Sequence, residues 1–307
     1  MKNTINFYYN IFLDELIKKD NCYYFYYGGD EYYFVPLNRP YDDVQSIYKL
    51  NLEMKKRRCL VHELVLNKDK SIITVVNGIS YVLIKLCKYK NDKVFLNDIN
   101  YIQNMTANIE CDKSLVRDDW IKLWSEKIDY YEYQISQVGK KYPLLCDSLS
   151  YFIGMGENAI SYLVNNLDSK TNVNLVVSHK RIYQESGSLN FYDPLNFVVD
   201  SRVRDVAEFI KETFYNKTLN LYDLKSYFNM ANLNKNEYIL LLGRLLFPTY
   251  YFDIYDDIIN KGKSEELVIN IIDRTDEYES LLNTIYKFIL YEKKARLEPI
   301  EWLQDKN

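Results

Sequence analysis

The sequence predicts an α+β protein with two lobes: a small antiparallel-sheet lobe with one helix, followed by a larger, mainly α-helical lobe. Short apolar runs separated by turn residues occupy residues 22–86, whereas amphipathic helical patterns dominate from residue 118 onward. A length of 307 residues allows each lobe a buried core. We therefore expect an N-terminal lobe over residues 1–88 and a C-terminal lobe over residues 89–307.

Paired turn residues predict the hairpins of the N-terminal lobe. Gly28 and Gly29 separate two tyrosine-rich runs, and Asn77 and Gly78 separate two β-branched runs. These residue types adopt the positive φ angles that tight hairpin turns require. A helix is predicted over Pro40–Arg58, which has an acidic start and a basic end. The strands expected are Cys22–Tyr27, Glu31–Pro36, Leu60–Leu66, Ser71–Val76 and Ile79–Leu86.

Stripes of large apolar side chains at helical spacing predict the helices of the C-terminal lobe. Trp120, Trp124, Ile128 and Tyr131 form one such stripe. In the next helix we expect Gly154 and Gly156 to permit close contact between helices. The helices expected are Asp118–Gln137, Cys146–Asn165, Leu221–Met230, Lys235–Phe247, Tyr250–Asn260, Ser264–Ile272 and Glu277–Lys294.

The densest short run of ionisable residues follows one short strand. The apolar run Asn174–Val177 predicts a buried strand that delivers His179 and Arg181 to a loop. Further extended segments are expected at Asn190–Asp193 and Asn196–Val199. A helical pattern then resumes, with Asp200 or Ser201 as its N-cap.

This order of strand, His-containing loop, Asp and helix start resembles the core of the aminoglycoside phosphotransferase-like kinases, most closely the spore-coat kinase-like group (spore coat protein S and YutH type). In that family the loop reads His-Gly-Asp followed by Asn, then a metal-binding Asp, then an Asp-Leu-Ala helix start. By this resemblance His179 holds the histidine place, Arg181 stands at the place of the catalytic Asp, and Ser186 falls near the Asn place. Asp193 becomes the candidate Mg²⁺ ligand, and Asp205 matches the structural Asp at the helix start. The resemblance implies a protein-kinase-like fold in which residues 175–200 form a degenerate catalytic loop.

Several parts that phosphoryl transfer needs are missing. A guanidinium at the place of Arg181 cannot accept a proton, because it stays charged at any accessible pH. The segment Glu31–Leu37 contains no Lys to pair with phosphates, and no G-x-G-x-x-G loop precedes it. Glu53, at the place of the residue that would pair with that Lys, is expected on a solvated helix face. The sequence thus favours a pseudokinase with no cofactor.

Three functions stay open at this point. The first is a catalytically degenerate structural or interaction protein, which the resemblance links to the bacterial spore coat. The second is an atypical ATP-dependent small-molecule phosphotransferase with displaced catalytic residues, and only this alternative requires ATP and Mg²⁺. The third is an unrelated α+β protein.

Composition narrows the partners and the compartment. A net charge of −4 gives no reason to expect nucleic acid as a partner. No apolar run approaches the roughly 18 residues of a membrane span, and the N-terminus is a poor signal peptide because acids interrupt its apolar part. We expect cytoplasmic synthesis and, from the resemblance, a location in the spore coat with coat proteins as partners. Five widely spaced cysteines without a C-x-x-C pair fit reduced thiols rather than a zinc site.

Tyrosine is over-represented, with 31 residues that often stand in pairs. An AT-rich genome explains such a bias through codon usage. Oxidative cross-linking of phenols in a coat is a second explanation, and both can hold.

Overall fold

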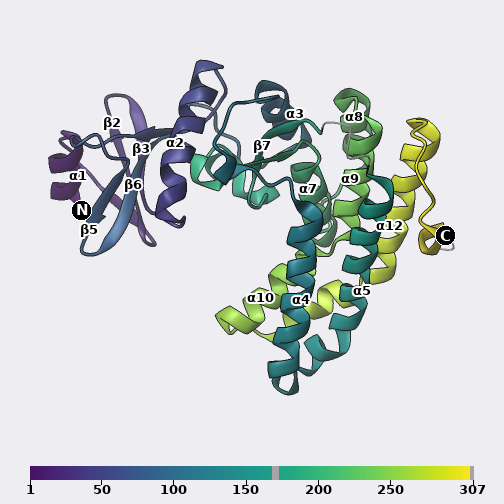
Figure 1. Cartoon of the computed structure of the whole chain (residues 1–307). Coiled ribbons are helices and arrows are strands. Elements are labelled where there is room, and N and C mark those ends of the chain that lie inside the picture. The colour runs from purple at the N-terminus through teal and green to yellow at the C-terminus, as the bar shows by residue number, and fades with distance from the viewer. Residues whose placement is uncertain (168–172, 305–307) are drawn as a thin grey trace. The chain divides into compact units, whose positions relative to one another are not determined.

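The computed structural model describes residues 1–167 and 173–304 and confirms the mixed α+β class (Figure 1). The chain forms two compact units. The first comprises Met1–Val116 and Leu175–Asp200, and the second comprises Arg117–Asn174 and Ser201–Asn307. Each compact unit is therefore built from two separate stretches of sequence. The lobe boundary after residue 88 stays a prediction.

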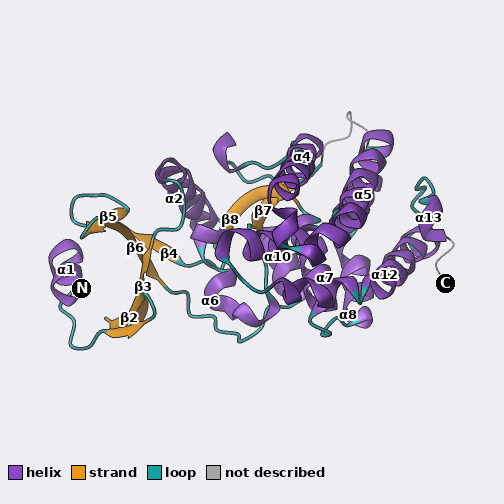
Figure 2. Ribbon diagram, turned by 90° about the horizontal axis from the view of Figure 1, so that it is seen from below, coloured by secondary structure: helices purple, strands orange, loops and turns teal. Residues whose placement is uncertain are grey.

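The first unit contains the predicted antiparallel sheet, with strands in the order β1-β2-β3-β6-β4 and β5 paired to β6 (Figure 2). All of these pairings are antiparallel. Pro36 ends its strand, where a missing N–H costs least. The strands are β1 (Ile17–Lys19), β2 (Cys22–Tyr27), β3 (Asp30–Pro36), β4 (Glu63–Val65), β5 (Ile73–Val76) and β6 (Ile79–Lys85).

Both predicted hairpin turns are present. Gly28 and Gly29 join β2 to β3 with φ angles of 60° and 82°. Asn77 and Gly78 join β5 to β6 with φ angles of 51° and 79°. Two successive positive φ angles produce the backbone twist that a two-residue hairpin needs, and this fixes the register of the flanking strands.

Two helices complete the N-terminal part of this unit, α1 (Lys2–Tyr9) and α2 (Tyr41–Lys56). Ile5 of α1 packs in one core cluster with Phe25, Phe34 and Leu83 from the strands. Helix α2 buries one apolar stripe at the expected helical spacing. That stripe consists of Val44, Ile47, Leu50 and Met54.

The remainder of the first unit carries the predicted catalytic loop. Strand β7 (Leu175–His179) pairs with β8 (Phe197–Ser201), and α3 (Leu96–Met105) packs against β7. The hydroxyl of Thr106, just after α3, accepts a hydrogen bond of 3.0 Å from the Val177 N–H. The Lys180 N–H, at the start of the loop between the two strands, donates to the Asn196 carbonyl at its end (2.8 Å), which holds the two ends of the loop together.

Two local predictions about this loop were wrong. The segment predicted as extended at Asn190–Asp193 instead begins inside a short helix, α6 (Gly187–Phe191), and ends at the cap of the next turn. The predicted N-cap at Asp200 or Ser201 is also wrong, because both residues are fully buried in β8, and α7 (Arg204–Tyr215) begins with Val203 as its N-cap. Pairing with β7 extends the strand past the polar residues that suggested a cap.

The second unit is helical, as predicted. Gly156 lies so close to Ile128 that an added Cβ would come within 2.6 Å of the Ile128 side chain, whereas an added Cβ at Gly154 meets no atom within 4 Å. The prediction of close helix contact is therefore confirmed for Gly156 and wrong for Gly154. The helices are α4 (Trp120–Val138), α5 (Pro143–Asn166), α7, α8 (Leu221–Ala231), α9 (Lys235–Leu246), α10 (Thr249–Lys261), α11 (Ile269–Ile272), α12 (Thr275–Lys287) and α13 (Glu301–Gln304). Within the described ranges, no helix has the length and apolar character needed to cross a membrane.

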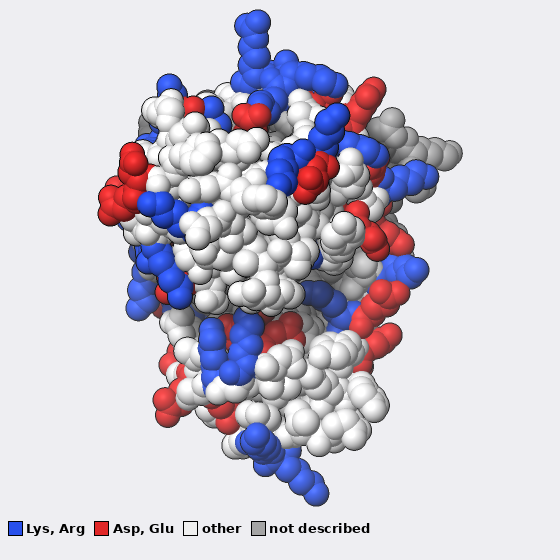
Figure 3. Space-filling view, turned by 90° about the vertical axis from the view of Figure 1, so that its left-hand side faces the viewer, with Lys and Arg blue, Asp and Glu red and all other residues white. Residues whose placement is uncertain are grey.

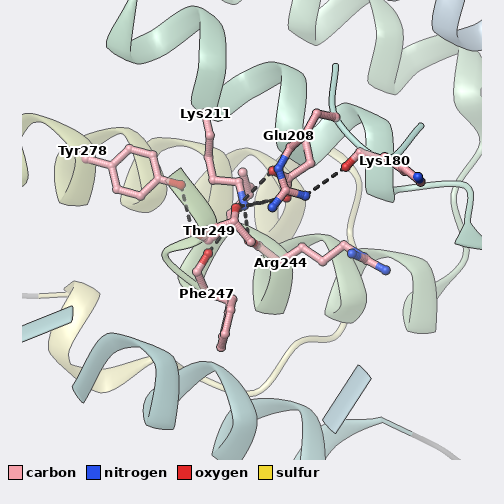
Figure 4. Close-up of polar contacts among 9 residues, drawn as sticks. Lys180, Glu208, Lys211, Arg244, Phe247, Thr249 and Tyr278 are labelled. Atoms are coloured by element: carbon pink, nitrogen blue, oxygen red, sulfur yellow. Dashed lines mark hydrogen bonds and ion pairs between the residues drawn. The ribbon is translucent and has the colours of Figure 1, made fainter. Parts of the chain in front are cut away.

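A buried lysine ties α7 to the end of α9 and the start of α10 (Figure 4). The ammonium of Lys211, which is 2% exposed, donates to the carbonyls of Arg244 (3.0 Å) and Phe247 (3.4 Å) and pairs with Glu208 at 2.8 Å. Thr249 hydrogen-bonds both Lys211 and Glu208. The lysine thus satisfies carbonyls that the end of α9 leaves without helical partners.

We expect Lys211→Met to lower the free energy of unfolding by about 3 kcal/mol, because buried carbonyls and a carboxylate would lose their charged partner. Urea denaturation measures this loss. The control is Lys122→Met on α4, where the side chain is 68% exposed and the expected change is within about 0.5 kcal/mol. Equal effects of the two substitutions would contradict a structural role for Lys211.

Candidate functional site

His179 ends β7 and turns its imidazole into the interior of the first unit. The ring is stacked on Phe191, with centroids 4.5 Å apart, and meets the edge of Phe197. Its Nε2 lies 2.7 Å from the Phe191 carbonyl oxygen. With an exposed fraction of 2%, His179 holds the two ends of the loop together.

Arg181 and Ser186 make local backbone contacts. The Arg181 guanidinium donates to the Lys180 carbonyl at 2.8 Å, and the Arg181 carbonyl accepts from the Asn196 side-chain amide at 3.1 Å. The Ser186 hydroxyl donates to the Tyr183 carbonyl at 2.7 Å. Among these contacts, Asn196 provides a cross-loop bond that the sequence did not suggest.

Asp193 caps the short 3₁₀ turn that leads into β8. Its Oδ1 accepts a hydrogen bond of 2.9 Å from the Leu195 N–H. Burial raises the pKa of Asp193 to about 6, and this effect outweighs the hydrogen bond to Leu195 and the positive charge of Arg39, which both lower the pKa. The carboxyl group is therefore partly protonated near pH 6. The sequence alone does not reveal this property, because it arises from burial.

Asp193 also lines a small polar cavity, here called the Asp193 cavity, with a volume of about 290 Å³. Lys180 contributes an ammonium group, and three side-chain amides face the same space. Arg181 is not among the lining residues. The lining residues are Cys22, Tyr33, Val35, Pro36, Asn38, Lys180, Asn190, Asp193, Leu195 and Asn196.

Arg39 crosses from the end of β3 to the loop. Its side chain is 1% exposed and donates to the carbonyls of Phe197 (2.6 Å) and Leu195 (3.2 Å). A second guanidinium nitrogen lies 3.5 Å from the Asp43 carboxylate at the start of α2. Glu53, in contrast, pairs with Lys56 and Arg57 at the end of α2, and its side chain is 26% exposed, less than the solvated position expected.

His62 braces a second region of the first unit. Its Nδ1 accepts from the Cys87 N–H at 3.1 Å, and its Nε2 lies 3.0 Å from the Leu189 carbonyl. Burial lowers the pKa of His62 to about 4, against the opposing effect of the hydrogen bonds with the backbone of Leu189 and Ser188. The ring is therefore neutral at pH 7, with Nδ1 as the acceptor.

Hydrogen bonds join the segment of residues 91–94 to the segment of residues 184–188. The Ser188 N–H donates to the Asn91 carbonyl at 2.8 Å, and the Asn91 N–H donates to the Ser188 hydroxyl at 3.0 Å. The Val94 N–H donates to the Gln184 carbonyl at 2.8 Å. Gly187 has a φ of 59°, and a Cβ there would lie 2.5 Å from the Asn91 carbonyl oxygen, so this close approach requires glycine.

These segments enclose a larger cavity of about 530 Å³, here called the tyrosine cavity. Tyrosines of β2 and β3 form one wall, and residues 86–87, 89–92 and 185–189 form the others. The lining residues are Tyr24, Phe25, Tyr26, Glu31, Tyr32, His62, Leu86, Cys87, Tyr89, Lys90, Asn91, Asp92, Glu185, Ser186, Gly187, Ser188 and Leu189.

Over residues 1–167 and 173–304, no three His, Cys, Asp or Glu side chains gather as metal ligands. Mg²⁺ is held by oxygen ligands in near-octahedral geometry. The Oδ1 of Asp193 is already hydrogen-bonded to the backbone. Whether Asp193 holds Mg²⁺ stays a prediction.

Comparisons with known proteins identify the family of the chain and agree with its fold. The family model described as "Spore coat putative kinase YutH" matches residues 2–285. The chain belongs to this family. It is also 30% identical over 207 residues to the "Endospore coat-associated protein YutH" of Bacillus subtilis (strain 168). That match covers 60% of this chain and 61% of the relative, so it spans about three fifths of the length of the relative.

Solved structures similar to this YutH-family chain are phosphotransferases. An aminoglycoside phosphotransferase from Alicyclobacillus acidocaldarius has a TM-score of 0.67 at 10% identity, with 92% of this chain and 94% of that chain covered. A spectinomycin phosphotransferase, solved with ADP and spectinomycin, has a TM-score of 0.60 at 9% identity, with 86% and 89% covered. These similarities confirm the kinase-like fold and, at such identities, nothing beyond it.

Two acids complete the description of this YutH-family loop. Asp205 lies buried in the first turn of α7, and its predicted structural role stays a prediction, as do the catalytic roles of His179, Arg181 and Asp193. Asp200 was not considered as a site residue, yet it is fully buried in β8. The signal available in the sequence was a carboxylate that directly follows a short buried β-branched run.

The shifted pKa values of His62 and Asp193 predict opposite effects on stability. As the pH falls from about 6.5 to 4, the unfolded chain binds a proton at His62 before the folded chain does, so stability is lost. The folded chain binds a proton at Asp193 near pH 6, above the unfolded value, so this carboxyl contributes stability that is lost as the pH rises through 6. The two contributions offset each other between pH 4 and 6.

Asp193→Asn should remove the contribution of the Asp193 carboxyl to the pH dependence of stability. As the pH falls from 6.5 to 4.5, we expect the free energy of unfolding of the wild type to rise by about 2 kcal/mol relative to that of this variant. For His62→Gln the advantage of the wild type should instead shrink over the same range. Urea denaturation at four pH values measures both differences, and pH-independent differences would contradict the shifts.

Proposed function

We propose that this YutH-family chain is a catalytically degenerate kinase-like protein that acts by binding, as a structural or interaction component linked to the bacterial spore coat. The observation that carries the proposal is Arg181 at the place of the catalytic Asp. A guanidinium cannot accept the proton of a substrate hydroxyl, and its charge repels Mg²⁺.

Two further features support this proposal. Strand β3 contains no Lys, and the basic residue after it, Arg39, is buried against the backbone of Leu195 and Phe197. Removing a single electrostatic element from an active site typically costs about 10²–10³ in rate. The combined absence of the loop Asp and the strand Lys makes the standard mechanism unworkable, so we expect no cofactor.

The link to the spore coat comes from the relatives. The family description and the B. subtilis protein both name the coat, and the match spans 61% of that relative. We therefore propose synthesis in the cytoplasm followed by association with coat proteins. On the face drawn in Figure 3, Lys and Arg are interspersed with Asp and Glu, which suits a protein partner better than nucleic acid.

One observation favours a second candidate, an atypical ATP-dependent phosphotransferase. The Asp193 cavity places a carboxyl group with a raised pKa beside the ammonium of Lys180 and three amides. Such a group could exchange a proton near neutral pH. ATP and Mg²⁺ would be needed only under this candidate.

Turnover distinguishes the two candidates. We expect no acceptor-dependent ATP hydrolysis or phosphoryl transfer by the wild type with a panel of hydroxyl and amine acceptors. We expect none from Arg181→Asp either, because the strand Lys remains absent. Robust turnover by the wild type that is abolished in a folded Asp193→Ala variant would overturn the proposal and make Asp193 catalytic.

A further inference from the structure

We propose that the tyrosine cavity binds a ligand with a flat apolar body that carries positive charge, such as an aromatic amine or a tryptophan side chain flanked by basic residues. The inference rests on the proposed function only in that the chain acts by binding. At about 530 Å³, the cavity lies within the size range of small-molecule sites.

The walls suit a flat apolar body. Phe25 is 2% exposed and provides a buried apolar surface, while Leu86 and Leu189 add aliphatic contacts. The ring of Tyr26 is 69% exposed, so its face is accessible at the mouth of the cavity. Aromatic faces stack on flat ligands and also attract cations through the ring quadrupole.

The charge of the lining favours a cation. Glu31, Asp92 and Glu185 line the cavity, against Lys90 as the one Lys or Arg among the described lining residues. Glu31 is paired with Lys90 at 2.5 Å, and Glu185 is paired with Lys93, just outside the lining, at 2.8 Å. Asp92 therefore supplies the negative charge that a bound cation would meet. His62 adds no positive charge at pH 7, because burial keeps its pKa low.

Three backbone donors in the lining of the cavity are already used inside the protein. The Leu86 N–H donates to the Glu31 carbonyl at 2.9 Å, and the Cys87 N–H donates to His62 at 3.1 Å. The Asn91 N–H donates to Ser188 at 3.0 Å. Phosphate groups are bound by such N–H groups or by unpaired cations. With these three donors used and Lys90 paired with Glu31, the lining offers more to an amine than to a phosphate group.

The proposal is tested with probes that share a ring and differ in charge. Tryptamine is compared with indole-3-propionate, and the peptide Ac-Lys-Trp-Lys-NH₂ with Ac-Glu-Trp-Glu-NH₂, by isothermal titration and by NMR shifts on the intact chain. We expect each cationic probe to bind at least about fivefold more tightly than its anionic counterpart. If Ac-Lys-Trp-Lys-NH₂ binds more tightly than tryptamine, the natural ligand is a partner protein. If these two cationic probes bind equally well, the natural ligand is a small amine.

Variants locate the binding. Tyr26→Ala should weaken binding of all four probes, whereas Asp92→Asn and Glu185→Gln should reduce the preference for cations toward one. The control is Glu126→Gln on α4, where the side chain is 61% exposed and no change is expected. Equal affinity for both charges, or binding that Tyr26→Ala leaves unchanged, would overturn the proposal. Neither result depends on ATP turnover, so the proposal and the pseudokinase assignment can fail separately.

Discussion

The neutral imidazole of His62 is the contact on which the first unit depends. The two ring nitrogens join the Cys87 N–H to the Leu189 carbonyl. The backbone N–H of His62 donates to the Tyr192 carbonyl at 3.0 Å. Asn51 of α2 donates to the His62 carbonyl at 2.8 Å. One buried residue therefore connects a helix, the segment after β6 and the loop between β7 and β8. A charged ring could not take this place, because it would lose its acceptor nitrogen and would be costly to bury.

Polar groups in and beside the loop between β7 and β8 follow the same principle. Within the loop, His179 contacts the Phe191 carbonyl and Asp193 accepts from the Leu195 N–H; Arg39, after β3, donates to Leu195 and Phe197. An active site needs donors and charges aimed at the reacting atoms and held ready for them. In this loop the same residue types hold the backbone in place. This arrangement supports a stable binding surface more readily than it supports phosphoryl transfer.

Patterns of local origin could be predicted from the sequence, whereas contacts that depend on packing could not. Gly28-Gly29 and Asn77-Gly78 specify their turns by φ preference alone. Helix α6 could not be foreseen, because Gly187 is required by an approach to the Asn91 carbonyl, a residue far away in sequence. Asp200 was misjudged for a related reason: a carboxylate after a β-branched run fits both a helix cap and a strand end, and only pairing with β7 decides between them.

The most direct test of catalytic degeneracy is thermal unfolding with millimolar ATP and Mg²⁺, compared with ATP and EDTA. A ligand that occupies the folded state far above its Kd raises the melting temperature by several degrees. If the polar groups of the first unit are committed to internal contacts, the melting temperature should stay within about 1 °C under both conditions. A rise of several degrees that depends on Mg²⁺ would contradict this account.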